Sequence, residues 1–174
     1  MLTVWHAPHP AWQPGDNWPR EVPVVRYDTN DAVVLIDPFL PPDGSFDPGG
    51  KPVHVLLTAP WHERGTADFV ERFAATVVTD APGVHAIRPD GDPVETLFCI
   101  EEFRTLVTGD VFSGTGGRFH VFFADEVDDR EAYLDSLERI ADLPIERVIV
   151  AHGVPVEGDG SARIREAVAE ARRA

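Results

Sequence analysis

The chain has 174 residues, of which 43% are hydrophobic and 26% charged, and this size and composition are typical of one globular domain. Its formal net charge of -15 would repel nucleic-acid phosphates, and its cations are scattered along the chain, so no nucleic-acid partner is expected. No apolar stretch approaches the ~20 residues that span a bilayer, so no membrane partner is expected either.

The start of the chain lacks the basic segment and apolar run of a secretory signal. The single cysteine, Cys99, cannot form an internal disulfide. We therefore expect a single domain over residues 1–174 in a reducing cytoplasm. The sequence does not indicate an oligomeric state.

The first segment, residues 1–21, is rich in tryptophan and proline, which disfavours a helix. We expect an extended arm, anchored by its aromatic rings and lying as a hydrophobic lid over the core. After it, short apolar runs rich in β-branched residues predict buried strands at 32–36, 53–57 and 148–151. Weaker strand candidates are 22–27, 76–78, 95–100, 104–107 and 119–123.

Amphipathic segments after residues 65, 127 and 160 predict helices. The expected capping residues are Thr66, Asp128 with Glu131 three positions later, and Ser161. Because strands and helices recur along the chain, the sequence predicts a mixed α/β fold.

Polar side chains follow the buried runs. They are Asp37, the loop at 58–64, Asp110 and His152. Ligands in layered α/β proteins bind beyond the carboxyl ends of strands, so these loops are expected to converge. For any one of them taken alone a turn is the simpler explanation, because Asp and His before Gly or Pro are common turn residues.

Taken in order, these segments resemble the metallo-β-lactamase superfamily. Val34-Leu-Ile-Asp37-Pro38 looks like that fold's early strand with its Asp turn, and Val55-Leu-Leu-Thr58 like the strand entering the metal loop. Leu106-Val-Thr-Gly-Asp110 looks like the strand with the metal-bridging Asp, and Val148-Ile-Val-Ala-His152-Gly153 like the strand with the last His ligand. The resemblance covers most of residues 22–160 and implies a compact four-layer αββα sandwich.

The chain departs from this family at the metal loop, whose pattern is Thr-His-x-His-x-Asp-His. Ala59 and Trp61 stand at the first two His positions, Glu63 stands at the Asp position, and Arg64 stands at the last His position. The family's third motif also lacks its His, and its nearest match offers only carboxylates such as Asp90. A two-zinc site is therefore not expected.

The resemblance leaves Asp110 and His152 at matching ligand positions, with Glu63 as a conservative substitute. A catalytic zinc normally has three protein ligands, so these residues, joined by His62, would suffice for one zinc, iron or manganese ion. Arg64 is permanently charged and would occupy the place of a second cation or pair with Asp110 or Glu63.

Three functional hypotheses follow. The leading one is a metallo-β-lactamase-like protein with a degenerate metal site that binds a small molecule with weak catalysis or none. Trp61, Asp37 and Asp90 would line its pocket, or Trp61 would fill the space that metals vacated. The second is a hydrolase of ester or thioester bonds that uses one metal ion, with Arg64 or His62 steadying the oxyanion.

The third hypothesis is a structural or partner-binding module that acts through the N-terminal arm. An exposed cluster of Trp5, Trp12 and Trp18 would support it, and burial of all three would exclude it.

Overall fold

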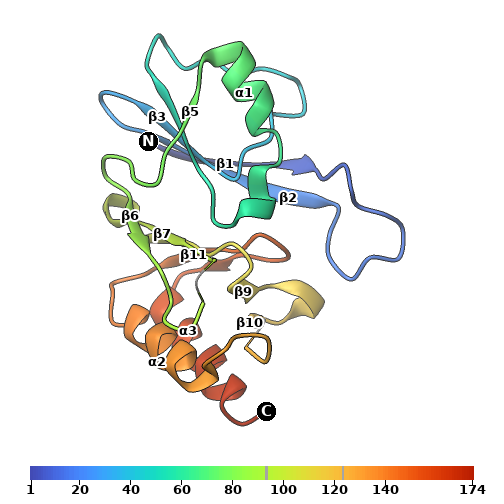
Figure 1. Cartoon of the computed structure of the whole chain (residues 1–174), viewed down its shortest axis with the longest axis vertical. Helices are drawn as coiled ribbons and strands as arrows, with labels where there is room; N and C mark the ends of the chain where they lie inside the picture. Colours follow the sequence, from blue (N-terminus) through green and yellow to red (C-terminus); the bar gives the residue numbers. More distant parts are fainter. Residues whose placement is uncertain (93, 123) are drawn as a thin grey trace.

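The computed structural model describes residues 1–92, 94–122 and 124–174, and two larger mixed sheets form its centre (Figure 1). The first sheet has five strands in the order β1-β2-β3-β4-β5, and the second has five in the order β12-β11-β8-β7-β6. The first comprises β1 (Leu2–Pro8), β2 (Glu21–Asp28), β3 (Val33–Ile36), β4 (Val53–Leu56) and β5 (Thr76–Val77). The second comprises β6 (His85–Ile87), β7 (Leu97–Ile100), β8 (Thr105–Val107), β11 (Arg147–Ile149) and β12 (Val156–Glu157).

Helices cover the outer faces of these sheets. They are α1 (Thr66–Phe73), α2 (Arg130–Ile140) and α3 (Gly160–Ala171). Short 3-10 turns precede α1 (η1, Pro60–Glu63), connect β7 to β8 (η2, Glu101–Phe103) and connect β9 to β10 (η3, Thr115–Gly117). A small pair, β9 (Phe112–Ser113) and β10 (His120–Val121), lies beside the second sheet. Figure 1 shows α1 against the first sheet, with α2 and α3 together at the opposite end of the molecule.

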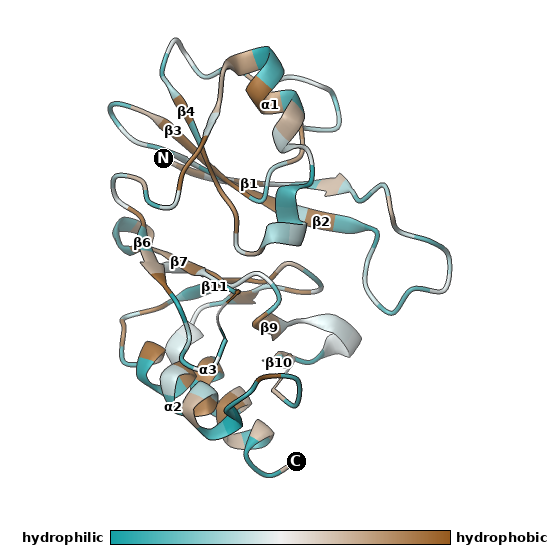
Figure 2. Ribbon diagram, in the orientation of Figure 1, coloured by the Kyte–Doolittle hydropathy of each residue, from teal (hydrophilic) through white to brown (hydrophobic). Residues whose placement is uncertain are grey.

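The buried side chains form three clusters that separate four layers. Val33 and Leu35 of β3 pack with Phe69 of α1, whereas Val34 and Ile36 join the cluster between the two sheets. This alternation is expected of a strand covered on both faces, and it explains why β3 is apolar throughout (Figure 2). The third cluster joins the second sheet to α2 and α3 and includes Leu97, Leu106, Val148, Leu134, Leu137, Ile164 and Val168. The predicted α/β class and αββα layering are confirmed.

The expected strands form, most of them with shorter bounds, whereas the strand predicted at 22–27 is longer and spans Glu21–Asp28. The run at 148–151 contributes only Val148 and Ile149 to β11, although the bond from the Ala151 N–H to the Gly109 carbonyl at 3.0 Å continues the pairing with the chain that follows β8. The candidate at 119–123 contracts to His120–Val121, and residue 123 lies outside the described residues.

The expected helix caps are wrong in detail. Asp129, one residue after the predicted Asp128, caps α2 by accepting the Ala132 N–H at 3.1 Å. Thr66 lies inside α1 and makes no capping bond, because Gly65 occupies the cap position. Ser161 lies inside α3, where its hydroxyl donates to the Leu143 carbonyl at 2.6 Å, so it joins the helix to the preceding loop.

The N-terminal arm extends the first sheet, since β1 pairs antiparallel with β2. Trp5, Trp12 and Trp18 are all half-buried, which is neither the exposed cluster expected of a partner-binding arm nor complete burial. Trp5 donates its indole N–H to the Phe39 carbonyl at 3.1 Å. Within the described residues, no helix is both long and apolar enough to cross a bilayer.

Candidate functional site

The site lies where strands of both sheets end. β3 and β4 are parallel, and Asp37 follows the first while Thr58 follows the second. β8 and β11 are also parallel, and they lead to Asp110 and His152. Parallel strands bring their carboxyl ends to one edge, so each sheet contributes a pair of neighbouring polar loops. The loops predicted to converge from the sequence therefore do so.

His62 reaches this site because the 3-10 turn Pro60–Glu63 directs its ring inward. Its side chain is buried, with a relative exposure of 4% for the residue. The next residue, Glu63, faces solvent. After the turn Arg64 adopts φ 46°, which reverses the chain into α1.

A buried set of hydrogen bonds orients the His62 ring. Asp37 accepts the Thr58 backbone N–H at 2.8 Å and the Thr58 hydroxyl at 2.6 Å. The Thr58 hydroxyl oxygen lies 2.7 Å from His62 Nδ1. Because the single hydroxyl proton of Thr58 points to Asp37, His62 Nδ1 carries the hydrogen and donates to Thr58. The other ring nitrogen, Nε2, is thereby turned toward the loop of the second sheet.

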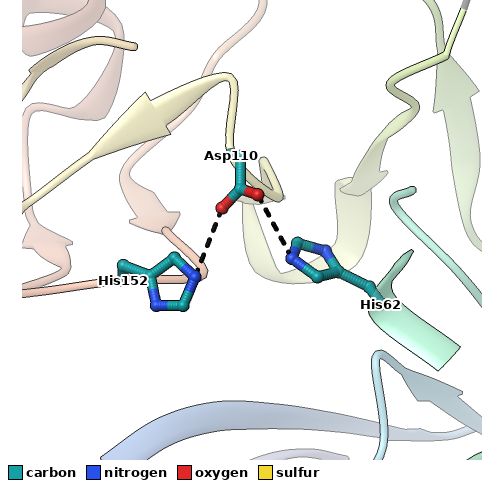
Figure 3. Close-up of side chains that lie close together, drawn as sticks. All are labelled: His62, Asp110 and His152. Carbon is teal, nitrogen blue, oxygen red and sulfur yellow. Dashed lines mark ion pairs between the residues drawn. The ribbon is translucent and has the colours of Figure 1, made fainter. Parts of the chain in front are cut away.

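His62, Asp110 and His152 come together at the end of this set (Figure 3). His62 Nε2 lies 3.3 Å from one carboxylate oxygen of Asp110, and His152 Nε2 lies 3.5 Å from the other. One ligand atom from each of the three residues lies within 4.8 Å of the other two. Among the described residues this is the one group of three or more His, Cys, Asp or Glu side chains placed to hold a metal ion.

This donor set fits a single metal ion. Two imidazoles and one carboxylate are ligands for zinc, iron and manganese, and their ligand atoms, which lie within 4.8 Å of one another, would have to draw together somewhat to make bonds of about 2 Å to one zinc ion. In metal sites the ligating imidazole usually donates its second N–H to an oxygen that fixes its orientation, which is what His62 Nδ1 does. His152 Nδ1, by contrast, is buried without a hydrogen-bond partner.

Without a metal ion, charge pairing holds the same residues together. Burial alone would lower the pKa of His62, but Asp37 and Asp110 outweigh it and raise the pKa to about 9. Burial opposes ionisation of Asp37 and Asp110, yet His62 keeps the pKa of both carboxyls below the ordinary value. At neutral pH His62 is therefore an imidazolium between two carboxylates.

His152 has the opposite electrostatics. Burial lowers its pKa to about 4, so its imidazole is neutral at pH 7 and free of a competing proton for metal binding. Part of this burial comes from the N-terminal arm, because the Trp18 ring packs against the His152 ring with their centroids 4.7 Å apart. The His9 ring in turn packs against Trp18, with a distance of 5.1 Å between the ring centroids. The arm thus covers one side of the site.

Arg64 and Trp61 support the site without filling it. Arg64 is held in the first sheet, where one of its guanidinium nitrogens donates to the carbonyls of Pro23 and Asp37 at 3.0 and 3.1 Å. Burial lowers its pKa, while Asp37 and Asp110 raise it. Trp61 donates its indole N–H to Asp110 at 3.1 Å, although 56% of the residue is exposed.

Two predicted site residues lie elsewhere. Glu63 points to solvent from the outer side of the 3-10 turn and is not part of the group that His62, Asp110 and His152 form. Asp90 is also exposed, where it pairs with Arg139 of α2 and donates its backbone N–H to the Ser136 hydroxyl at 3.1 Å. Asp37, expected in the pocket wall, is instead buried beneath His62.

The structure adds Glu95, which the sequence analysis placed only as the first residue of a strand. Only 3% of this residue is exposed, and neither carboxyl oxygen has a hydrogen-bond partner in the described part of the chain. Burial, reinforced by the nearby charge of Asp110, raises its pKa to about 8. An acidic residue two positions before the buried strand β7 was the available signal, but it matches no motif.

Comparisons with known proteins agree on the fold. No known family profile and no curated protein matches the sequence. Among solved structures, an archaeal metallo-β-lactamase superfamily protein, ST1585 from Sulfolobus tokodaii, aligns with a TM-score of 0.64 and 14% identity, over 97% of this chain and 85% of that one. The metallo-β-lactamase FIM-1 from Pseudomonas aeruginosa, in its mono-zinc form, aligns with a TM-score of 0.59 and 10% identity, over 98% and 91% of the two chains.

A third structure, TTHA1623 in a di-iron-bound form, aligns with a TM-score of 0.62 and 21% identity, over 84% of this chain and 93% of that one. The chain therefore has the metallo-β-lactamase fold. Similar structures include proteins that bind one zinc ion and two iron ions. At these identities the likeness defines the fold, and the function has to be argued from the site.

Proposed function

We propose that the chain is a metal-dependent hydrolase that holds a single divalent ion with His62, Asp110 and His152. The orientation of His62 carries this proposal. Its Nδ1 is fixed by Thr58, so its Nε2 faces the Asp110 carboxylate that His152 Nε2 also faces. The ligand set differs from the one expected from the sequence, because His62 takes the place that was assigned to Glu63.

The surrounding residues prepare this set for a cation. Asp37 holds the Thr58 hydroxyl, and through it the His62 ring, in one orientation. Arg64 donates to the Asp37 carbonyl, and its charge helps to keep the Asp37 carboxylate ionised. A divalent metal ion would supply Lewis-acid chemistry and activation of water, and this chemistry can hydrolyse ester or thioester bonds. One guanidinium nitrogen of Arg64 bonds the first sheet, whereas its Nε and its other terminal nitrogen have no hydrogen-bond partner among the described residues, so a role of Arg64 in steadying a substrate oxyanion stays a prediction. His62 would serve here as a ligand.

A second candidate function is a small-molecule-binding protein that needs no metal. The observation that favours it is the imidazolium of His62 between Asp37 and Asp110, which balances the buried charge with a proton instead of an ion. In this state the three residues would serve as a structural ion cluster. The two candidates differ in one measurable property, the metal content.

Metal analysis of protein purified without chelator tests the first proposal. We expect close to one equivalent of zinc, iron or manganese. The affinity for that ion should fall at least about tenfold in His152→Ala or His62→Ala, since each substitution removes one of three ligands. The matched control is Glu63→Gln, which changes the exposed neighbour of His62 and should leave the metal content unchanged.

Two outcomes would contradict the metal site. One is absence of metal even after reconstitution with each ion, which would favour the metal-free binding protein. The other is loss of metal in Glu63→Gln with retention in His62→Ala, which would restore the ligand set expected from the sequence.

A further inference from the structure

A surface hollow of about 320 Å³ adjoins the candidate metal site. Trp61 links the two, because it lines the hollow while its indole N–H bonds Asp110. Two valines, Val94 and Val127, supply the apolar part of the lining. The hollow therefore has an aromatic and aliphatic wall next to the residues that we propose as metal ligands.

The charged lining of this hollow is entirely acidic in the described residues. Asp92, Glu95, Glu126 and Asp128 all contribute to it, and no Lys or Arg does. Glu126 and Asp128 are exposed, whereas Glu95 is buried. The hollow thus combines carboxylates of different depth with an exposed indole.

Glu95 distinguishes this hollow from an ordinary acidic surface. A residue with only 3% exposure and an ionisable carboxyl group would normally have hydrogen-bond partners for that group, because an unpaired buried polar group destabilises the fold. Both oxygens of Glu95 lack such a partner in the described chain. A ligand with a positively charged N–H donor would provide it.

The geometry favours an organic cation over a metal ion at this place. A metal ion requires several ligand atoms that converge on one point, and the acidic residues of the hollow do not form such a group. An alkylammonium group can instead donate to Glu95 while its carbon atoms contact Val94 and Val127. The face of Trp61 attracts a cation through its ring electrons.

We propose that this hollow binds a small organic cation, an amine carried on a short apolar body, and presents it beside His62, Asp110 and His152. If the amine is the substrate, the proposal names the substrate class of the proposed hydrolase and rests on that function. Binding of the amine, however, depends on the hollow alone, and it can therefore be tested in protein stripped of metal.

The test is titration of chelator-treated protein at about pH 9, where Glu95 is ionised and the amine is still protonated, with isopentylamine and with its neutral isostere isopentyl alcohol. Binding is followed at the indole N–H resonance of Trp61, which is assigned by its loss in Trp61→Phe. We expect the amine to bind at least about tenfold more tightly than the alcohol, and Glu95→Gln to remove that preference, because one charge-assisted hydrogen bond is lost. Trp61→Ala lacks this resonance, so its affinity for the amine is measured by isothermal titration calorimetry alongside the unsubstituted protein, and we expect binding about fivefold weaker through loss of the cation–π contact.

The control is Glu71→Gln, which neutralises an exposed carboxylate on α1 and should leave the affinity for the amine unchanged. Glu95→Gln keeps the size of the side chain, and a urea unfolding curve establishes that it is folded. Equal binding of amine and alcohol, no binding of either, or a preference that survives Glu95→Gln would overturn the proposal. Because no metal is present, a failure here is separate from a failure of the metal analysis.

Discussion

The raised pKa of His62 predicts that the metal-free protein loses stability as the solution becomes alkaline. In the unfolded chain His62 should titrate near 6.5, whereas in the folded chain its pKa is about 9. A group whose pKa is higher in the folded state contributes stability that is fully present below pH 6.5 and disappears as pH rises through about 9. The difference between the folded and unfolded pKa values of His62 corresponds to roughly 3 kcal/mol of folding stability, because each pKa unit is worth about 1.4 kcal/mol.

Two other groups titrate near this window. The pKa of Glu95, raised to about 8, makes stability fall between its ordinary value of 4.5 and about 8, and so it overlaps the His62 effect. The pKa of His152, lowered to about 4, makes stability rise between about 4 and 6.5, and this change is complete before the His62 window opens. Glu95→Gln therefore provides the right background for the measurement.

The assay is urea unfolding of chelator-treated protein at several pH values between 6.5 and 9.5. In Glu95→Gln we expect the free energy of unfolding to fall by roughly 3 kcal/mol over this range, and in Glu95→Gln with His62→Gln we expect most of that fall to vanish. Other groups that titrate in this range are common to both proteins and cancel. An equal fall in the two proteins would refute the charge assignment of His62.

Further substitutions test the parts that hold His62 and His152. Thr58→Val keeps the shape of the side chain but removes the hydroxyl between Asp37 and His62, so unfolding free energy should drop by about 1–3 kcal/mol; no change in urea unfolding would mean that these bonds are dispensable. Trp18→Ala should expose the His152 ring and move its pKa upward from about 4 toward 6.5, as followed by NMR, and an unmoved pKa would contradict the covering role of the arm. Gly109→Ala should cost at least about 2 kcal/mol in thermal or urea unfolding, since Gly109 has φ +55° and a Cβ there would lie 2.6 Å from the Thr58 hydroxyl; wild-type stability would disprove this packing.

Much of the fold could be predicted from the sequence because two signals indicate each buried strand, a continuous apolar run and a polar turn after it. Runs such as Val33–Ile36 are apolar on both faces, as a strand between two layers must be, and each is followed by a polar turn. Strand ends and helix caps were less accurate. A helix cap depends on a single hydrogen bond, such as the one that Ala132 donates to Asp129 at the start of α2, and the residue pattern does not tell Asp129 from its neighbour Asp128.

The candidate site was predicted in part for a similar reason. Asp110 and His152 are each the third residue after one of two neighbouring parallel strands, so the strand ends place them together. His62 and Glu63 are neighbours on a short turn, and the sequence alone does not say which one faces inward. Glu95 depends on burial by segments remote in sequence, and no local pattern records that burial.

The division of the site between the two sheets has a consequence for folding. Asp37 and His62 belong to the half of the chain that forms the first sheet, and Asp110 and His152 belong to the half that forms the second. Their meeting is a long-range contact that exists only after both halves have formed and docked, so it belongs to a late stage of folding. Whatever cation joins these residues, a proton or a metal ion, therefore acts as a cross-link between the halves. Its loss should show first as faster amide hydrogen exchange along the strands that face each other.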